Sequence, residues 1–451
     1  MKAQGFRDTG RFKRAMAKPA VLTPSNLKEL MRLLEPLTLI ATPIRAKGAG
    51  TSSTDCNSSP QGTVIRMTGL DRILKIDNYN HTVTAEAGVR LGQLVAALAE
   101  QGLELIGSPE QYERTLGGAI AAPCFGPTAG RQAGCFSSHV QSVKMVTAGG
   151  KLIKVDASQK HLMNAIRSSY GMLGIICQAT VNVRPITTFT ATHRRVTIDK
   201  FAKSVDALAN GDAGLKFYLL PYRDSVYLDL RRYDDNAADS WRAPWKLKDW
   251  GESTVLPQVF KSLNRVVPIP SVRYRLIDRI SAATQGLVNT RLVNTGSHAS
   301  MGASYRKRRK ARRLLSSTWC FPAADFSFVL QAYRDFCHNT LEQSGYRCDM
   351  PAVGYRVSRD PAALLSPSFD ESVIALQSLS TQQDGWEDFV IDLAEFAEQW
   401  GGTPLFHDSR ALRAEYAGQV YAGRLEFFRK IRRQLDPDNR LLNPFLAQSF
   451  K

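Results

Sequence analysis

The chain has 451 residues, and 43% of them are hydrophobic, so it is long enough to bury the cores of two or three domains. No apolar run approaches the length of a membrane-spanning helix, which argues against a chain that crosses a bilayer. The seven cysteines are scattered, odd in number and include no CxxC pair. This usage argues against a disulfide framework or a thiolate metal site and favours the cytoplasm.

The formal net charge of +18 is concentrated in one part of the chain. Residues 261–313 contain thirteen lysines and arginines and a single acidic residue, Asp278. Basic residues mixed with valine, isoleucine and leucine suit an anionic membrane surface, so a peripheral position at the inner face of the membrane is a further expectation. A nucleic-acid surface would use the charge but not the apolar residues and is the less favoured partner. The third interpretation is a solvated face with no partner.

The first half of the chain predicts a mixed α+β domain. A helix is expected over 24–34, with Thr23 as its cap and leucines along one face. Short strands with alternating patterns are then expected at 37–41, 63–67, 72–77 and 81–87. A second helix is predicted over 90–101, and Gly102 ends it.

Three glycine-rich loops follow predicted strands of this domain. The first, RAKGAGTSSTD at 45–55, combines glycines, which let backbone amides approach a ligand, with hydroxyl groups. It suits an anion but matches neither the P-loop nor the dinucleotide fingerprint. The second loop contains TLGGAIA at 115–121, and the third contains YGMLGII at 170–176. Three such loops in one domain indicate a large ligand.

The order of these loops resembles the FAD-binding domain of the vanillyl-alcohol oxidase and p-cresol methylhydroxylase superfamily. The C-terminal LDPDNRLLNPFL is similar to the closing motif of its aldonolactone oxidase and decaprenylphosphoryl-ribose oxidase branch. The resemblance implies an α+β fold in which a second, substrate-binding domain is an antiparallel sheet covered by helices. The implied divisions are a basic tail at 1–19, an FAD-binding domain at 20–186, a substrate domain at 187–402 with a basic, partly mobile segment at 240–320, and a segment at 403–451 that returns to the flavin.

The resemblance also implies which residues bind FAD. The first loop would wrap the pyrophosphate, the second would continue along it, and the third would place backbone groups against the cofactor. Many relatives bond the flavin covalently through a histidine directly after GxG, and here that position is Thr51, so non-covalent FAD is expected. The implied cofactor-binding residues are Lys47, Gly48, Ala49, Gly50, Thr51, Ser52, Ser53, Thr115, Gly117, Gly118, Ala119, Ala121, Gly134, Ser137, Gly174, Ile175, Ile176 and Asn443.

The catalytic residues are expected in the second half of the chain. His407, in LFHDSR, is the expected acceptor of a hydroxyl proton. In the alternative interpretation it only neighbours a helix cap, with Asp408 or Ser409 capping the residues that follow. Arg356 is expected on a strand beside the flavin, where a cation would stabilise the charge that reduction creates. The histidines show no ligand spacing, so no metal site is expected.

These residues predict an FAD-dependent oxidase or dehydrogenase that takes a hydride from an alcohol carbon of a sugar, a sugar lactone or a lipid-linked sugar. One alternative is a hydroxy-acid or sugar-alcohol oxidase, although such enzymes carry an acidic residue where Gly354 stands here. The other is a flavin-bearing module whose main task is docking to a membrane or to nucleic acid. The sequence leaves the electron acceptor open.

Overall fold

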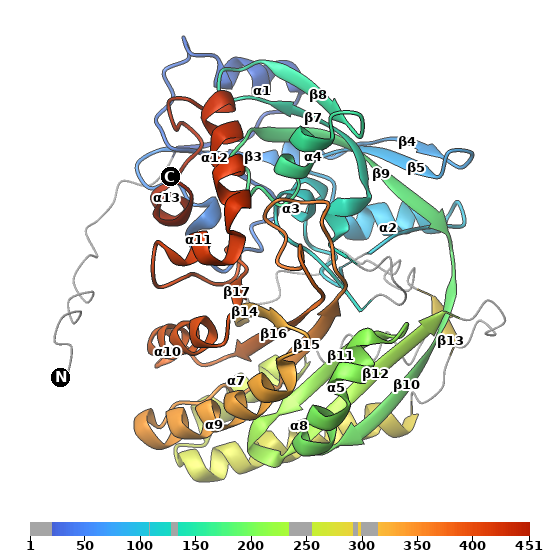
Figure 1. The fold of residues 1–451 in the computed structure, drawn as a ribbon, viewed down its shortest axis with the longest axis vertical. Coiled ribbons are helices and arrows are strands. Elements are labelled where there is room, and N and C mark those ends of the chain that lie inside the picture. Colours follow the sequence, from blue (N-terminus) through green and yellow to red (C-terminus); the bar gives the residue numbers. More distant parts are fainter. Residues whose placement is uncertain (1–19, 108, 128–133, 234–254, 292–295, 299–313) are drawn as a thin grey trace.

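The structure is a computed structural model that describes residues 20–107, 109–127, 134–233, 255–291, 296–298 and 314–451. The predicted basic tail at 1–19 and the basic cluster at 305–313 lie outside the described residues. The described part of the chain forms two domains, and helices from the C-terminal part return to the first of them (Figure 1). This arrangement of helices and antiparallel sheets confirms the predicted α+β class.

The first domain begins with a small parallel sheet among the described residues, in the order β1-β3-β2. Its strands are β1 (Ala20–Leu22), β2 (Ile44–Lys47) and β3 (Thr63–Arg66). Helix α1 (Leu27–Leu34) starts later than predicted, because the side chain of Asn26 accepts a hydrogen bond from Glu29 N at 3.0 Å and caps it.

The strand predicted at 37–41 is wrong, because these residues form an irregular segment. Its two leucines face solvent, since Leu37 is 92% exposed and Leu39 is 97% exposed, and Ile40 packs against the core beside α1. The strand was predicted from the apolar residues of 37–41, and that prediction assumed that these side chains are buried.

A larger, mostly antiparallel sheet completes the first domain. In the described residues its order is β4-β5-β9-β7-β8, and β6 also pairs with β9. The strands are β4 (Ile73–Asp77), β5 (Thr82–Glu86), β6 (Leu103–Leu105), β7 (Val140–Val146), β8 (Leu152–Asp156) and β9 (Ile175–Pro185). The helices are α2 (Leu91–Ala99), α3 (Leu116–Ala121) and α4 (Lys160–Ile166), and short 3₁₀ turns lie at η1 (Asp55–Asn57), η2 (Met67–Gly69) and η3 (Phe136–His139).

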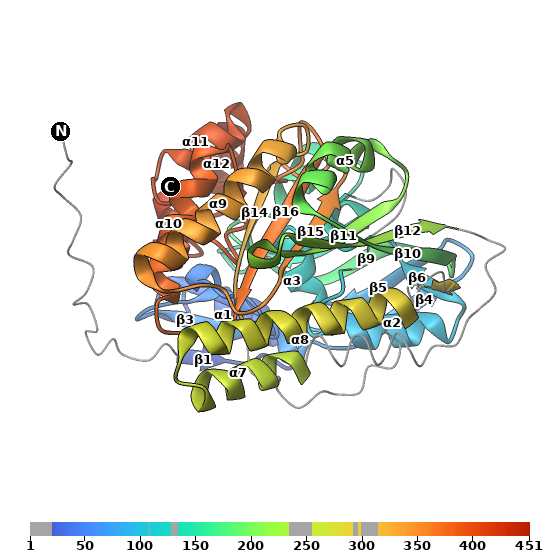
Figure 2. The same ribbon diagram turned by 90° about the horizontal axis from the view of Figure 1, so that it is seen from below.

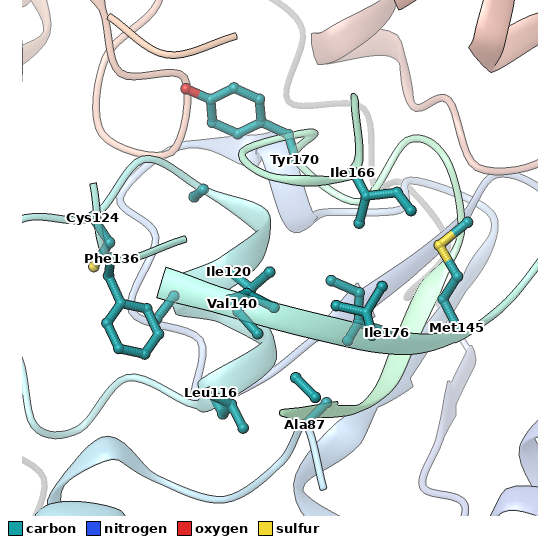
Figure 3. Packing of buried hydrophobic residues seen from close by; sticks show 14 of the residues in the cluster. Ala87, Leu116, Ile120, Cys124, Phe136, Val140, Met145, Ile166, Tyr170 and Ile176 are labelled. Carbon is teal, nitrogen blue, oxygen red and sulfur yellow. The ribbon is translucent and has the colours of Figure 1, made fainter. Parts of the chain in front are cut away.

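The core of this domain lies between the sheet and α3. Figure 3 shows Leu116 and Ile120 of α3 packed beside Val140 of β7 and Ile176 of β9. Tyr170 lies on the turn before β9 and belongs to the same buried cluster. This packing fixes two of the glycine-rich loops relative to the sheet.

The second domain is an antiparallel sheet whose order in the described residues is β13-β10-β12-β11-β15-β16-β14-β17. The strands are β10 (Thr188–Val196), β11 (Gly214–Leu220), β12 (Ser225–Tyr233), β13 (Gly296–His298), β14 (Leu315–Pro322), β15 (Ala352–Val357), β16 (Val373–Ser380) and β17 (Thr403–Pro404). A 3₁₀ turn, η4 (Pro221–Arg223), joins β11 to β12.

Helices cover both faces of this sheet (Figure 2). One face packs against α5 (Ile198–Asn210), α9 (Phe326–Ser344) and α10 (Trp386–Gln399). The other packs against α8 (Pro270–Arg291), which follows α7 (Leu256–Val266). The α8 face also meets the first domain, because Phe125 lies against Tyr355 of β15. None of the described helices is long and apolar enough to cross a membrane.

The C-terminal helices rejoin the core of the first domain. They are α11 (Tyr416–Tyr421), α12 (Gly423–Leu435) and α13 (Pro444–Phe450). Phe406, Tyr421, Phe428 and Phe450 belong to the same buried cluster as Tyr170. The segment that carries His407 is therefore held from both sides, by β17 in the second sheet and by these helices.

Candidate active site

A recess with an empty volume of about 800 Å³, including space open to solvent, is lined by all three glycine-rich loops and by His407. The predicted cofactor-binding residues that line it are Gly48, Ala49, Gly50, Thr51, Ser52, Thr115, Gly117, Gly118, Ala121, Gly174 and Ile176. The structure therefore brings together residues that are more than 350 positions apart in the sequence.

The loops approach one another so closely that side chains are excluded. A Cβ atom on Gly48 would lie 2.0 Å from Thr115 Oγ1, and one on Gly174 would lie 3.0 Å from the carbonyl oxygen of Val146 in β7. Gly50 has a φ of +70°, a left-handed conformation that favours glycine. The recess is thus walled largely by backbone and small residues, which fits a long, flat ligand with a pyrophosphate such as FAD.

Seven predicted cofactor-binding residues do not line the recess, and five of them have other surroundings in the described structure. Ala119 and Ile175 point into hydrophobic cores. The buried Ser137 hydroxyl lies 3.3 Å from that of Ser168. Gly134 packs against Asp360, and a Cβ atom there would lie 2.7 Å from its carboxylate. Ser53 donates its hydroxyl hydrogen to Asp408 at 2.5 Å.

The other two are Lys47 and Asn443. Lys47 ends β2, and its aliphatic chain lies under Gly50. Asn443 caps α13, and its amide donates at 2.8 Å to the carbonyls of Asp55 and Ser58. Asn443 therefore supports the turn that follows the first loop without lining the recess itself.

Arg356 lies on β15, as predicted, but on the face of the sheet away from the first domain. Its Nη1 donates to the carbonyls of Ala209, at 3.0 Å, and Gly211 at the end of α5. The neighbouring Tyr355 points the other way, toward Phe125. Arg356 therefore does not line the recess, because side chains alternate along a strand and this one falls on the face covered by α5, α9 and α10.

His407 follows β17 and is buried at the edge of the recess. Its carbonyl accepts hydrogen bonds from Ser53 N at 3.0 Å and Ser52 Oγ at 2.7 Å, so its backbone is fixed to the first loop. Burial, together with the nearby Arg114 guanidinium, lowers the pKa of His407 well below its ordinary value. The imidazole is therefore neutral, and in the described structure its Nδ1 has no hydrogen-bond partner.

Three residues that the sequence interpretation did not single out also line the recess: Arg45, Arg114 and Tyr170. Arg114 directly precedes the second loop and donates to Cys124 Sγ at 3.1 Å. Tyr170 has a φ of +50°, and its hydroxyl accepts a hydrogen bond from Phe406 N at 3.2 Å. A non-glycine residue in this conformation is strained, and such strain often occurs at functional sites.

Arg45 joins the segments around the recess. Its guanidinium donates to the carbonyls of Cys56 at 3.0 Å, Leu441 at 2.6 Å, Gly171 at 3.3 Å and Tyr170. Burial lowers its pKa to about 10, and it remains charged at neutral pH. Arg45 opens the first loop motif, so its position was visible in the sequence, but the carbonyls it binds were not.

Comparison with known families agrees with this geometry. Residues 19–156 match a family model described as an FAD binding domain, and residues 179–449 match one described as D-arabinono-1,4-lactone oxidase. The two matches together cover most of the chain, and the description of the first agrees with FAD as the cofactor of the recess. Since the second model matches more than half of the sequence, the chain belongs to the D-arabinono-1,4-lactone oxidase family.

Individual relatives are distant or match in part. L-gulono-1,4-lactone dehydrogenase of Mycobacterium tuberculosis H37Rv is 30% identical over 210 residues, 47% of this chain and 48% of that protein. The chain thus spans about half the length of that relative. L-gulonolactone oxidase of Scyliorhinus torazame is 22% identical over 95% of this chain and 94% of its own. Decaprenylphosphoryl-beta-D-ribose oxidase of Mycolicibacterium smegmatis is 34% identical over 32% of this chain and 31% of its own.

Solved structures share the fold across nearly the whole chain. Cholesterol oxidase from B. sterolicum has a TM-score of 0.77 at 14% identity, covering 96% of this chain and 94% of that one. Xylooligosaccharide oxidase from Myceliophthora thermophila has a TM-score of 0.67 at 15% identity, covering 96% and 92%. At these identities the likeness concerns the fold alone.

Proposed function

We propose that this protein is an FAD-dependent oxidoreductase that oxidises a CH–OH group of a sugar, a sugar lactone or a lipid-linked sugar. The observation that carries the proposal is the convergence of His407 with the three glycine-rich loops on one recess. A neutral imidazole beside a cofactor site is suited to accept the hydroxyl proton of an alcohol. The names of the relatives, which include lactone dehydrogenases and a lipid-linked ribose oxidase, support this substrate class.

The glycine-rich loops would hold the cofactor. Their backbone amides, with the hydroxyl groups of Thr51, Ser52 and Thr115, provide donors for a pyrophosphate. When bound, FAD supplies the acceptor for the hydride that leaves the alcohol carbon. We propose non-covalent binding, because a threonine hydroxyl at position 51 does not replace the histidine that forms the flavin bond in many relatives.

The side chains around the recess would orient the substrate and receive its proton. His407 accepts the hydroxyl proton, and the carbonyl carbon forms as the hydride departs. Tyr170 supports this position, since its hydroxyl fixes the backbone of Phe406 and its ring centroid lies 6.4 Å from that of His407. The convergence of these groups favours an enzyme over a flavin-bearing docking module.

The decisive experiment compares the wild-type protein with His407→Gln. Acid precipitation of the wild type should release a yellow flavin into the supernatant. Anaerobic reduction of the bound flavin is then followed with D-arabinono-1,4-lactone and L-gulono-1,4-lactone. In His407→Gln the flavin should remain bound while its reduction slows on the order of one hundred-fold or more. Unchanged reduction would remove His407 from the mechanism.

A second proposal concerns the surface where α7 meets α8, and we propose that it binds anionic lipid. Val266 at the end of α7 is 76% exposed, Ile269 in the connection is 58% exposed, and Val272 in the first turn of α8 is 43% exposed. Arg265 and Arg275 beside them are also exposed. Apolar side chains flanked by arginine suit shallow insertion at an acidic membrane surface, which would bring the protein to a lipid-linked substrate.

A further inference from the structure

The Asp408 carboxylate joins the two domains beside the recess. It accepts hydrogen bonds from Ser53 Oγ, Ser316 Oγ and Thr318 Oγ1, each at 2.5 Å, and from Gln377 Nε2 at 3.3 Å. Ser53 belongs to the first glycine-rich loop, whereas the other three donors lie on β14 and β16 of the second sheet. The Asp408 side chain therefore holds the first glycine-rich loop against β14 and β16.

The backbone around Asp408 is tied to the same loop. Thr54 Oγ1 donates to the carbonyl of Phe406 at 2.5 Å, and Ser52 Oγ and Ser53 N donate to the carbonyl of His407. These hydrogen bonds consequently fix the first loop to the segment that carries His407. The alternative role of Asp408 as a helix cap is excluded, because α11 begins only at Tyr416.

The charge of Asp408 opposes that of Arg114 near His407. Burial raises the pKa of the Asp408 carboxyl, but the hydrogen bonds from the surrounding hydroxyl groups favour the carboxylate, and the pKa lies below its ordinary value. Arg114 disfavours a protonated His407, whereas the Asp408 carboxylate favours it. The groups that bond Asp408 from β14, β16 and the first loop are neutral.

We infer that Asp408 is a positioning residue, which fixes His407 and the Thr51 to Ser53 loop against the second sheet and stabilises the imidazolium that forms when His407 takes a proton. This inference rests on the proposed role of His407 and adds to it, since the Asp408 carboxylate binds the same loop that binds the carbonyl of His407. It assigns to a residue outside the recess lining an effect on the rate of proton transfer.

Asp408→Asn tests the inference, because it keeps the shape of the side chain and removes the charge. The saturating rate of anaerobic flavin reduction should fall about ten-fold, since an opposite charge at short range shifts a pKa by about 1 to 3 units. The substrate concentration that gives half this rate should stay within about two-fold. An effect confined to that concentration, or no effect, would overturn the inference.

The matched control is Asp349→Asn. Asp349 is buried in the second domain and accepts hydrogen bonds from Thr381 Oγ1 at 2.5 Å, Asn264 Nδ2 at 2.7 Å and Ser380 Oγ at 3.3 Å, but it does not line the recess. Its loss should lower thermal stability and leave both kinetic parameters unchanged. If it slows reduction as much as Asp408→Asn, the effect is general destabilisation and the positioning role is refuted.

A readout independent of turnover is the rate at which FAD leaves the protein, followed by flavin fluorescence. Asp408→Asn and Ser53→Ala should each speed release several-fold, and the double variant should release FAD more slowly than the product of the two effects predicts, because both remove one interaction. Independent effects that simply multiply would contradict the proposed link between Asp408 and the loop.

Two further comparisons separate the possible failures. If His407→Gln reduces as fast as wild type, the proposed function of His407 and the charge role of Asp408 both fail. If His407→Gln is slow and Asp408→Asn is not, only the inference fails. Should Asp408→Asn not retain FAD, Thr318→Val removes a single donor to the same carboxylate: a smaller loss of rate supports the inference, and an unchanged rate overturns it.

Discussion

His407 is buried as a neutral group between charges of opposite sign. Arg114 and burial oppose its protonation, and Asp408 favours it. The balance holds the pKa of His407 well below the ordinary value of about 6.5, so the native protein resists taking up a proton that the unfolded chain binds readily. His407, the proposed proton acceptor, therefore also makes the stability of the folded protein sensitive to acid.

The first prediction at this scale concerns stability at low pH. Because the folded pKa of His407 is depressed, its contribution to stability is fully present above about pH 6.5 and is lost as the pH falls below that value. His407→Gln should therefore lose less stability than wild type between about pH 7.5 and 5.5. Denaturant unfolding at both pH values measures this difference, and equal losses would contradict it.

The second prediction concerns the contact between two glycine-rich loops. In Gly48→Ala the new methyl group would lie 2.0 Å from Thr115 Oγ1, so the loops must separate and FAD retention should fall sharply. Gly149→Ala is the control, because no atom lies within 4 Å of the added carbon. Flavin content per protein, measured by absorbance after gel filtration, checks both. Full occupancy in Gly48→Ala would show that the loop contact is dispensable.

Among the elements, the sequence predicted a helix with a regular apolar stripe and several strands rich in apolar and β-branched residues. The helix over 90–101 and the strands at 63–67, 72–77 and 81–87 appear as α2, β3, β4 and β5. The face of β15 could not be predicted, because its residues are almost all buried and alternation carries no signal there. The sequence therefore predicted that Arg356 lies on a strand but could not predict which face of the sheet its side chain occupies.

The prediction for the connection between α7 and α8 is reversible, salt-sensitive binding to vesicles that contain phosphatidylglycerol, with weak binding to phosphatidylcholine alone. Replacing Val266, Ile269 and Val272 by serine should abolish most of this binding. Replacing the exposed Leu37 and Leu39 by serine should not, because they lie in a different loop. Sedimentation with vesicles gives the measurement. Retention on duplex DNA with no binding to anionic vesicles would favour the nucleic-acid alternative.

In the whole molecule, the recess is lined by loops of the first domain and by His407, which lies more than 200 positions after the last of these loops. The order of the three loops was visible in the sequence and predicted the FAD-binding domain, and most of the predicted loop residues line the recess. The contributions of Arg45, Tyr170 and Asp408 could not be predicted, since each depends on partners that lie far away in the sequence. A sequence motif shows where the backbone requires glycine, whereas hydrogen bonds between residues far apart in the sequence can be identified only in the folded structure.

The prediction at this scale concerns Phe450, which packs against Phe406 with ring centroids 4.9 Å apart. Phe450→Ala should reduce the free energy of unfolding by about 3 to 5 kcal/mol, because it leaves a cavity in a core shared by α13 and the first domain. The control Phe328→Ala, at an exposed position, should change it by less than about 0.5 kcal/mol. Urea unfolding measures both, and similar values for the two variants would contradict the shared core.

The contact of Arg45 with the carbonyl of Leu441 spans 396 positions. A ribosome makes the first glycine-rich loop and the carbonyls of Cys56, Tyr170 and Gly171 well before it makes the carbonyl of Leu441, the fourth acceptor of the guanidinium. Until then the Arg45 guanidinium of the nascent chain lacks the Leu441 carbonyl as an acceptor, and water must solvate it there. A chain halted before Leu441 would therefore lack one of the four carbonyls that hold Arg45 beside the recess.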